Sequence, residues 1–127
     1  MIPAPHLKIK IQIHCGDEIA MGPGKADLLE AIVHHGSISA AARAMGMSYR
    51  RAWLLVDTMN RCWSAPLVHT RPGRSPDGGA QLTAMGKQVL LHYRALQDDI
   101  DRASHGPDHT ALAQCLLASP KPSQKDG

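Results

Sequence analysis

The chain is short of aromatic residues: its 127 residues include no Phe, two Trp and two Tyr. Because aromatic side chains often dominate a core, the interior must be filled mainly by Leu, Ile, Val, Ala and Met. The apolar fraction of 43% is enough for a small core. A chain of this length forms one domain, or one domain with a tail, and can gain stability from a partner subunit.

Cysteine is also scarce. Cys15, Cys62 and Cys115 are widely spaced and form no C-x-x-C pair, which argues against a disulfide framework or a zinc ribbon. No apolar run approaches the ~18 residues of a membrane-spanning helix, and the first residues do not resemble a signal peptide. We therefore expect a cytoplasmic protein that is associated with the nucleoid when it binds DNA.

The sequence also lacks a catalytic or metal-binding motif. His34 and His35 are adjacent and would chelate poorly together on a helix, and Gly106-Pro107 interrupts any helix that could join His105 to His109. No Ser/His/Asp string or nucleophile elbow is present. We predict no enzymatic activity, no bound metal and no cofactor.

Positive charge is concentrated in the middle of the chain, although the net charge is only +3. Residues 37–104 hold nine Lys/Arg against five Asp/Glu, whereas residues 1–36 hold three against four and residues 105–127 hold two against two. A central excess of cations favours an anionic partner such as nucleic acid.

The stretch 36–63 predicts two helices joined by a tight turn. A short Ala-rich helix is expected from Ser39 to Met45, a turn at Gly46–Ser48, and a second helix from Tyr49 to Trp63. Ser48 can cap the second helix through its hydroxyl. This is the plan of a helix-turn-helix that reads DNA with its second helix.

The predicted recognition helix, residues 48–63, has one buried face and one exposed face. The buried stripe is expected at Ala52, Leu55, Val56, Met59, Cys62 and Trp63. The exposed face begins with a basic turn, and arginine can bind guanine bidentately or bind a phosphate. The predicted DNA-contacting residues of this helix are Ser48, Tyr49, Arg50, Arg51 and Leu54.

A β-hairpin is expected at residues 67–82, directly after the recognition helix. Strands at Leu67–Thr70 and Ala80–Leu82 flank a loop rich in Gly, Pro and Ser. Such a hairpin is the wing of a winged helix. Arg71 and Arg74 are expected to contact the phosphate backbone, where they give affinity without sequence choice.

Two elements are expected before the helix-turn-helix. Strict alternation of apolar and polar residues predicts a half-buried strand over residues 7–13, with the odd positions toward the core. Helical spacing predicts a supporting helix from Lys25 to His35, ended by Gly36 in the left-handed conformation. The predicted fold class is α+β, mostly α, with an N-terminal strand, a three-helix core and a wing.

A long helix is expected at residues 83–104, capped by Thr83. Its near-heptad stripe predicts a dimerisation surface at Val89, Tyr93, Leu96 and Ile100. Packing of this helix back onto the first helix is the alternative. The winged-helix domain then covers residues 1–104, and residues 105–127 form a mostly disordered tail with a short helix at 111–118.

From Leu7 to about Ile100 the sequence resembles the DNA-binding domain of the ModE family of molybdate-responsive bacterial regulators. The resemblance is carried by GPGKADLLEAI at 22–32, GSISAAARAMGMSYRRAW at 36–53, Asp57–Asn60, and Gly78–Thr83 followed by Gly86. The winged helix is also similar in outline to that of LysR-type regulators.

The resemblance implies a homodimer that binds a palindromic operator, with the helix beginning at Ser48 in the major groove. Full regulators of this family bind molybdate in C-terminal barrel domains. The residues after about Ser104 show no run of alternating strands, so we expect no oxyanion sensor here and no molybdate binding. The wing departs from the glycine-rich family pattern at Arg74–Asp77.

Two other functions are possible on this sequence. Cys and His residues near the dimer interface could make a metal- or small-ligand-responsive DNA-binding sensor. The winged helix and the long helix could instead form a protein–protein interaction module. A stoichiometric metal that alters operator affinity would identify the first, and a lack of salt-dependent DNA binding would identify the second.

Overall fold

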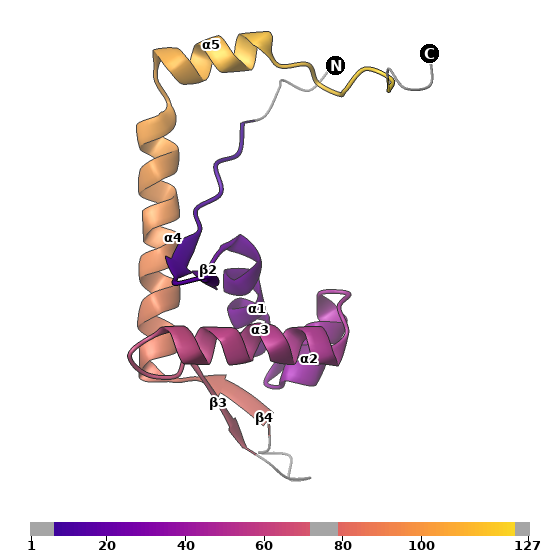
Figure 1. Cartoon of the computed structure of the whole chain (residues 1–127), viewed down its shortest axis with the longest axis vertical. Helices are drawn as coiled ribbons and strands as arrows, with labels where there is room; N and C mark the ends of the chain where they lie inside the picture. The colour runs from indigo at the N-terminus through magenta and orange to yellow at the C-terminus, as the bar shows by residue number, and fades with distance from the viewer. Residues whose placement is uncertain (1–6, 72–78, 124–127) are drawn as a thin grey trace. The chain divides into compact units, whose positions relative to one another are not determined.

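The computed structural model describes residues 7–71 and 79–123 (Figure 1). The elements in these ranges are β1 (Ile13–Cys15), β2 (Glu18–Met21), α1 (Pro23–His35), α2 (Ile38–Ala44), α3 (Tyr49–Cys62), β3 (Val68–Arg71), β4 (Gly79–Leu82), α4 (Ala84–Ser104) and α5 (Pro107–Cys115). Contacts divide the chain into one unit of residues 10–97 and a second of residues 1–9 and 98–127. The predicted class, a mostly α winged helix, is confirmed.

The strand predicted over residues 7–13 is wrong in position. β1 begins only at Ile13 and pairs with β2 in a short antiparallel hairpin. Among the described residues, those before Ile13 have no strand beside them. Ile11 contacts the core, but Ile9 is 52% exposed, so the odd positions do not all face the core as predicted.

Local caps set the ends of the three core helices. Gly36 ends α1 with φ of 75°, a left-handed conformation that glycine adopts without strain. The Ser37 hydroxyl accepts a hydrogen bond from the Ala40 N–H at the start of α2, and the Ser48 hydroxyl accepts one from the Arg51 N–H at 3.1 Å. These are N-caps, and the observed bounds of α2 and α3 agree with the predicted ones within one residue.

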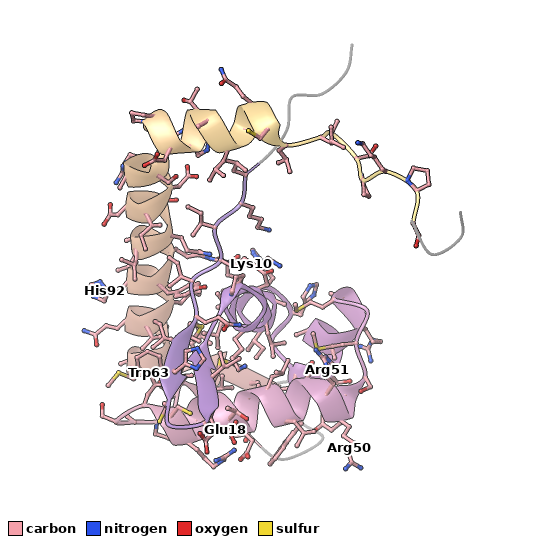
Figure 2. The ribbon with its side chains drawn as sticks, turned by 45° about the horizontal axis from the view of Figure 1, so that its top comes forward. Lys10, Glu18, Arg50, Arg51, Trp63 and His92 are labelled. Carbon is pink, nitrogen blue, oxygen red and sulfur yellow. The ribbon has the colours of Figure 1, made fainter. Side chains whose placement is uncertain are left out.

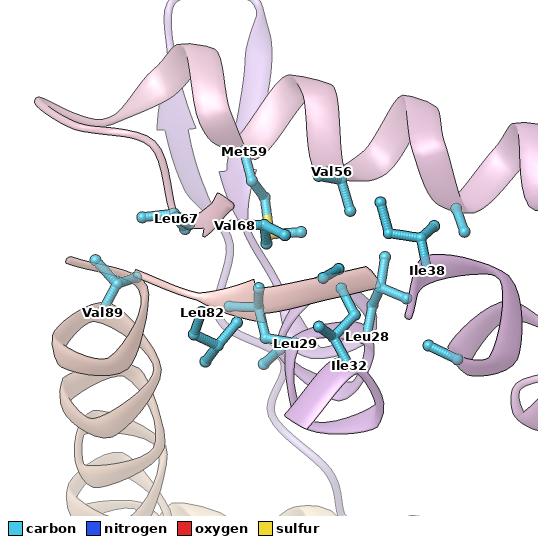
Figure 3. Close-up of a cluster of buried hydrophobic side chains, with 14 of the residues drawn as sticks. Leu28, Leu29, Ile32, Ile38, Val56, Met59, Leu67, Val68, Leu82 and Val89 are labelled. Atoms are coloured by element: carbon cyan, nitrogen blue, oxygen red, sulfur yellow. The ribbon is translucent and has the colours of Figure 1, made fainter. Parts of the chain in front are cut away.

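One hydrophobic core lies between α1, α2, α3, the wing and α4 (Figure 3). Its largest fully buried side chains are Tyr93, Met21, Leu28, Leu29, Ile32, Met59 and Leu67. Of the stripe predicted on α3, Ala52, Val56 and Met59 are buried and the other three residues are partly exposed. The recognition helix is therefore held through its middle, with its first turn outside the core.

α4 packs against its own subunit through Val89 and Tyr93, which are 9% and 2% exposed. The Tyr93 hydroxyl donates a 2.7 Å hydrogen bond to a backbone carbonyl of the N-terminal segment. The Arg94 guanidinium pairs with Asp27 and Glu30 of α1 at 2.8 and 2.7 Å. These contacts attach α4 to α1 and to the N-terminal segment, and the dimerisation surface at Val89, Tyr93, Leu96 and Ile100 stays a prediction.

The residue before α4 is hydrogen-bonded to the start of the wing. The Thr83 N–H donates to the Leu67 carbonyl at 2.9 Å, and the Thr83 hydroxyl donates to the Pro66 carbonyl at 2.6 Å. The Thr83 hydroxyl also accepts the Gly86 N–H at 3.0 Å, as expected of an N-cap. A Cβ on Gly86 would lie 2.1 Å from the Leu67 carbonyl oxygen. Glycine is therefore required for the close approach of α4 to this segment.

The tail contains a helix earlier than predicted. α5 begins at Pro107 and ends at Cys115, whereas the helix was expected at 111–118. Proline fits the first turn of a helix because its missing N–H would have no partner there. Described residues 116–123 form no helix or strand, and the predicted domain division at residue 104 stays a prediction. None of the described helices combines the length and the apolar character needed to cross a membrane.

Replacing Gly86 with Ala should lower the free energy of unfolding by about 1–3 kcal/mol, because the added methyl group overlaps the Leu67 carbonyl and displaces α4. Urea titration of both proteins measures the difference. Gly24→Ala on α1 is the matched control, because a Cβ there meets nothing within 4 Å. It should leave stability unchanged or raise it by up to about 1 kcal/mol. Equal stability of the two variants would contradict the close approach.

Candidate nucleic-acid interface

The first turn of α3 presents unpaired positive charge. Arg50 and Arg51 are exposed, and neither forms an ion pair within residues 7–71 and 79–123. At the other end of the helix, Arg61 is paired with Asp57 at 3.0 Å and with Glu18 at 3.9 Å. Figure 2 shows the two ends, with Arg50 and Arg51 at one and Glu18 at the other. The free charge of α3 is therefore at its N-terminus.

The helix itself adds to this charge. The backbone N–H groups at the start of a helix point outward, and the helix dipole places partial positive charge there. In α3 the Ser48 hydroxyl satisfies one of these groups. The other N–H groups of this turn lie at the same helix end as Arg50 and Arg51, so the first turn of α3 is suited to bind phosphate oxygens.

An open groove of about 380 Å³ lies between the start of α2, the exposed side of α3 and the root of the wing. Its lining residues are Ser37, Ile38, Ser39, Tyr49, Trp53, Thr70, Arg71, Gly79 and Ala80. Tyr49 and Trp53 are 56% and 46% exposed. They are four residues apart and share one face of α3. The groove thus brings the predicted contact residues Tyr49 and Arg71 together.

The other predicted contact residues have different positions. Leu54 is 52% exposed on α3, outside this groove. Arg74 lies outside the described residues. Trp53 also lines the groove, but it was not among the predicted DNA-contacting residues. Its spacing of four residues from Tyr49 could have placed it on the same face of the helix. Two large apolar side chains on one exposed face form the kind of contiguous patch that marks an interaction site.

Asn60 connects α3 to the wing. Its side-chain carbonyl accepts the N–H groups of Leu67 and Val68 at 2.9 and 3.0 Å, and its side-chain amide donates to the Val68 carbonyl at 3.2 Å. One side chain near the end of α3 thereby holds the first strand of the wing at both its N–H and C=O groups. The sequence gives no role to this residue, because its partners lie beyond the helix end.

The second strand of the wing is attached to the helix-turn-helix. The Ala80 N–H donates to the Gly36 carbonyl in the turn between α1 and α2 at 2.9 Å. Gly79 has φ of 139°, and a Cβ there would lie 2.2 Å from the Gly36 oxygen. In the wing, β3 and β4 pair antiparallel with Arg71 opposite Gly79. The root of the wing is therefore fixed relative to α2 and α3.

Comparison with known proteins gives this arrangement a family. The family described as "Bacterial regulatory helix-turn-helix protein, lysR family" matches residues 25–87. The chain carries a LysR-family, ModE-type helix-turn-helix domain. The match runs from the start of α1 through α2, α3 and the wing into the first turn of α4, so it includes the basic turn, the groove and Asn60. The description of the family is that of regulatory proteins, and several of the similar proteins are named as transcriptional regulators.

Three relatives illustrate the similarity of this ModE-type domain. The molybdenum-pterin-binding protein MopB of Rhodobacter capsulatus is 46% identical over 61% of this chain and 28% of its own. The molybdenum transport protein ModE of Azotobacter vinelandii is 42% identical over 67% and 33%. The dual regulator ModE of Escherichia coli K12 is 33% identical over 71% and 33%. The aligned region thus spans about a third of these relatives.

The side chains that commonly bind metals are dispersed in the described part of the chain. Within residues 7–71 and 79–123, no group of three or more His, Cys, Asp or Glu side chains is placed to hold a metal ion. The adjacent His34 and His35, in the last turn of α1, are both exposed.

Replacing Asn60 with Ala should lower the free energy of unfolding by about 1–3 kcal/mol, because the Leu67 and Val68 N–H groups lose their acceptor. Thermal unfolding followed by circular dichroism measures this loss of stability relative to the wild type. Thr58→Ala is the control on the same helix, since Thr58 bonds only the exposed Leu54 carbonyl. That variant should change stability by less than about 0.5 kcal/mol. A similar small loss for Asn60→Ala would show that Asn60 does not hold the wing.

Proposed function

We propose that this chain is a sequence-specific DNA-binding transcriptional regulator. The observation that carries the proposal is the unpaired basic first turn of α3, which lies beside a wing that is fixed to the same helix. A duplex needs a helix for its major groove and a cationic support for its phosphates. α3 and the β3–β4 hairpin supply these two parts.

In this mechanism the N-terminal half of α3 enters the major groove. Arg50 and Arg51 bind guanine edges or phosphates, both of which suit the planar guanidinium. Tyr49, Trp53 and Leu54 supply apolar surface that can contact thymine methyl groups. The DNA-binding set further includes Ser48, Arg71 and Arg74, with the wing arginines on the phosphate backbone.

The regulator acts as a homodimer in this proposal. α4 exposes Leu96, which is 41% exposed, and the ring of His92 beside it. An open apolar groove of about 340 Å³ lies along this face, lined by Ile13, Trp63, Met85, Gln88, Val89, His92, Tyr93 and Leu96. The helix of a second copy covers it, with Ile100 continuing the stripe. Two recognition helices would then face one palindromic operator.

Changing Arg50 to Ala should weaken binding to the cognate duplex by about 1–3 kcal/mol, which is about 5- to 150-fold, if its guanidinium reads a base. The cognate sequence is first selected from a randomised duplex library, and affinity is then measured by fluorescence anisotropy. Arg61→Ala removes the same charge from α3. It should change affinity little, because two carboxylates already neutralise Arg61.

The wild-type affinity should also fall steeply with salt, by about 0.9 units of log–log slope for each phosphate contact. An equal loss for Arg50→Ala on every sequence would reassign Arg50 to a phosphate. No loss on any sequence would reject α3 as the recognition helix. Salt-independent binding, or none, would favour the protein–protein interaction module.

Leu96→Asp should convert dimers to monomers in sedimentation velocity, because it places a charge in the apolar groove that the second copy covers. Leu91→Asp is the matched control, since Leu91 is 66% exposed on α4 but does not line the groove. It should remain dimeric. Unchanged circular dichroism verifies that both variants fold, and a dimer that survives Leu96→Asp would reject this interface.

A further inference from the structure

Two free cysteines that take no part in the proposed DNA contacts meet at the C-terminal end of α3. Cys15 ends β1 and is exposed, and Cys62 ends α3 and is partly exposed. Burial, followed by a side-chain hydrogen bond with Cys15, raises the pKa of the Cys62 thiol. The hairpin that carries Cys15 pairs with α3 on both sides of Cys62, so the fold brings these two cysteines to the same end of α3 although 46 residues separate them in the sequence.

Other contacts hold these cysteines together. In the β1–β2 hairpin Cys15 lies opposite Glu18. Glu18 pairs with Arg61, the residue before Cys62, at 3.9 Å. The indole N–H of Trp63, the residue after Cys62, donates to the Ala20 carbonyl of β2 at 3.2 Å. The hairpin is thus attached to α3 on both sides of Cys62, and this geometry does not depend on the thiols themselves.

We propose that Cys15 and Cys62 form an oxidation site, which a peroxide converts into an intramolecular disulfide. The exposed Cys15 reacts first, as its thiolate attacks one peroxide oxygen. With hydrogen peroxide, the O–O bond breaks, Cys15 becomes a sulfenic acid, and the hydroxide that leaves takes up the proton released by the Cys15 thiol as one water.

The second step closes the bond. The Cys62 sulfur attacks the Cys15 sulfur, the S–O bond breaks, and hydroxide leaves and takes up the Cys62 proton as a second water. The two thiols together lose two hydrogen atoms and two electrons, and the peroxide gains them. The charge of Arg61 lowers the pKa of Cys62 and so opposes the effect of burial, whereas Glu18 raises it.

The disulfide would tie the N-terminal hairpin to the end of the recognition helix. Closing the chain between Cys15 and Cys62 restricts the unfolded state, which stabilises the folded one. Cys115 on α5 is also exposed and free but is not part of the proposed pair, so it provides an internal comparison.

The test uses the full chain, reduced and then treated with one equivalent of hydrogen peroxide. The intact mass should fall by two hydrogen atoms per chain, and peptide mapping should join the peptides of Cys15 and Cys62. The unfolding temperature should rise on the order of 10 °C. Dithiothreitol should reverse both changes. No DNA is present, so the result is independent of the proposed DNA binding.

Variants identify the pair. Cys115→Ser should still lose two hydrogens and gain thermal stability, whereas Cys15→Ser and Cys62→Ala should do neither. Cys15 is exposed, so its reduced variant should fold like the reduced wild type. Peroxide products joined through Cys115, covalent dimers, or sulfinic acid on Cys15 in the wild type would each overturn the proposal. The same would follow if Cys15→Ser gained stability on oxidation.

Discussion

The backbone of Leu67 is the point at which the recognition helix, the wing and the long helix are joined. Its N–H is accepted by the Asn60 side chain of α3, and its carbonyl accepts the N–H of Thr83. The same carbonyl leaves no room for a side chain at Gly86, and the Leu67 side chain itself is fully buried. Because buried backbone groups must be paired, this segment cannot move without breaking the bonds of α3 or of α4. The angle between the helix and the wing follows from that constraint.

The two ends of α3 have different chemistry. Its start carries unpaired arginines and the free N–H groups of the first turn, beside the groove that includes Tyr49 and Arg71. Its end carries Arg61, which two carboxylates neutralise, and Cys62, which contacts the N-terminal hairpin. The unpaired charge at the start of α3 is suited to phosphate binding, whereas the paired charge at its end attaches the helix to the domain. The proposed DNA contacts and the proposed oxidation site are thus separated along one helix.

Helix bounds and the general fold could be predicted because their signals are local. The caps Ser48 and Thr83 and the left-handed Gly36 each act within three or four residues of the chain, and the structure confirms all of them. The misplaced strand has a different cause. Alternation in residues 7–13 indicates a strand only if another strand lies beside it, and in the described part of the chain pairing begins at Ile13. A periodic stripe likewise does not say which surface covers it, so the dimerisation surface of α4 stays a prediction.

The sequence by itself determined the helix-turn-helix, the basic first turn of α3, the buried middle of that helix and the hairpin after it, because hydrogen bonding and periodicity over a few residues encode them. Only the tertiary structure decided that Tyr93 lies in the core, that Asn60 holds the wing, that Trp53 shares a groove with Arg71, and that Cys15 meets Cys62. Each of these contacts joins residues from separate elements, and their partners are selected by how the helices and hairpins pack. Packing is a property of the whole chain, so no short stretch of sequence contains it.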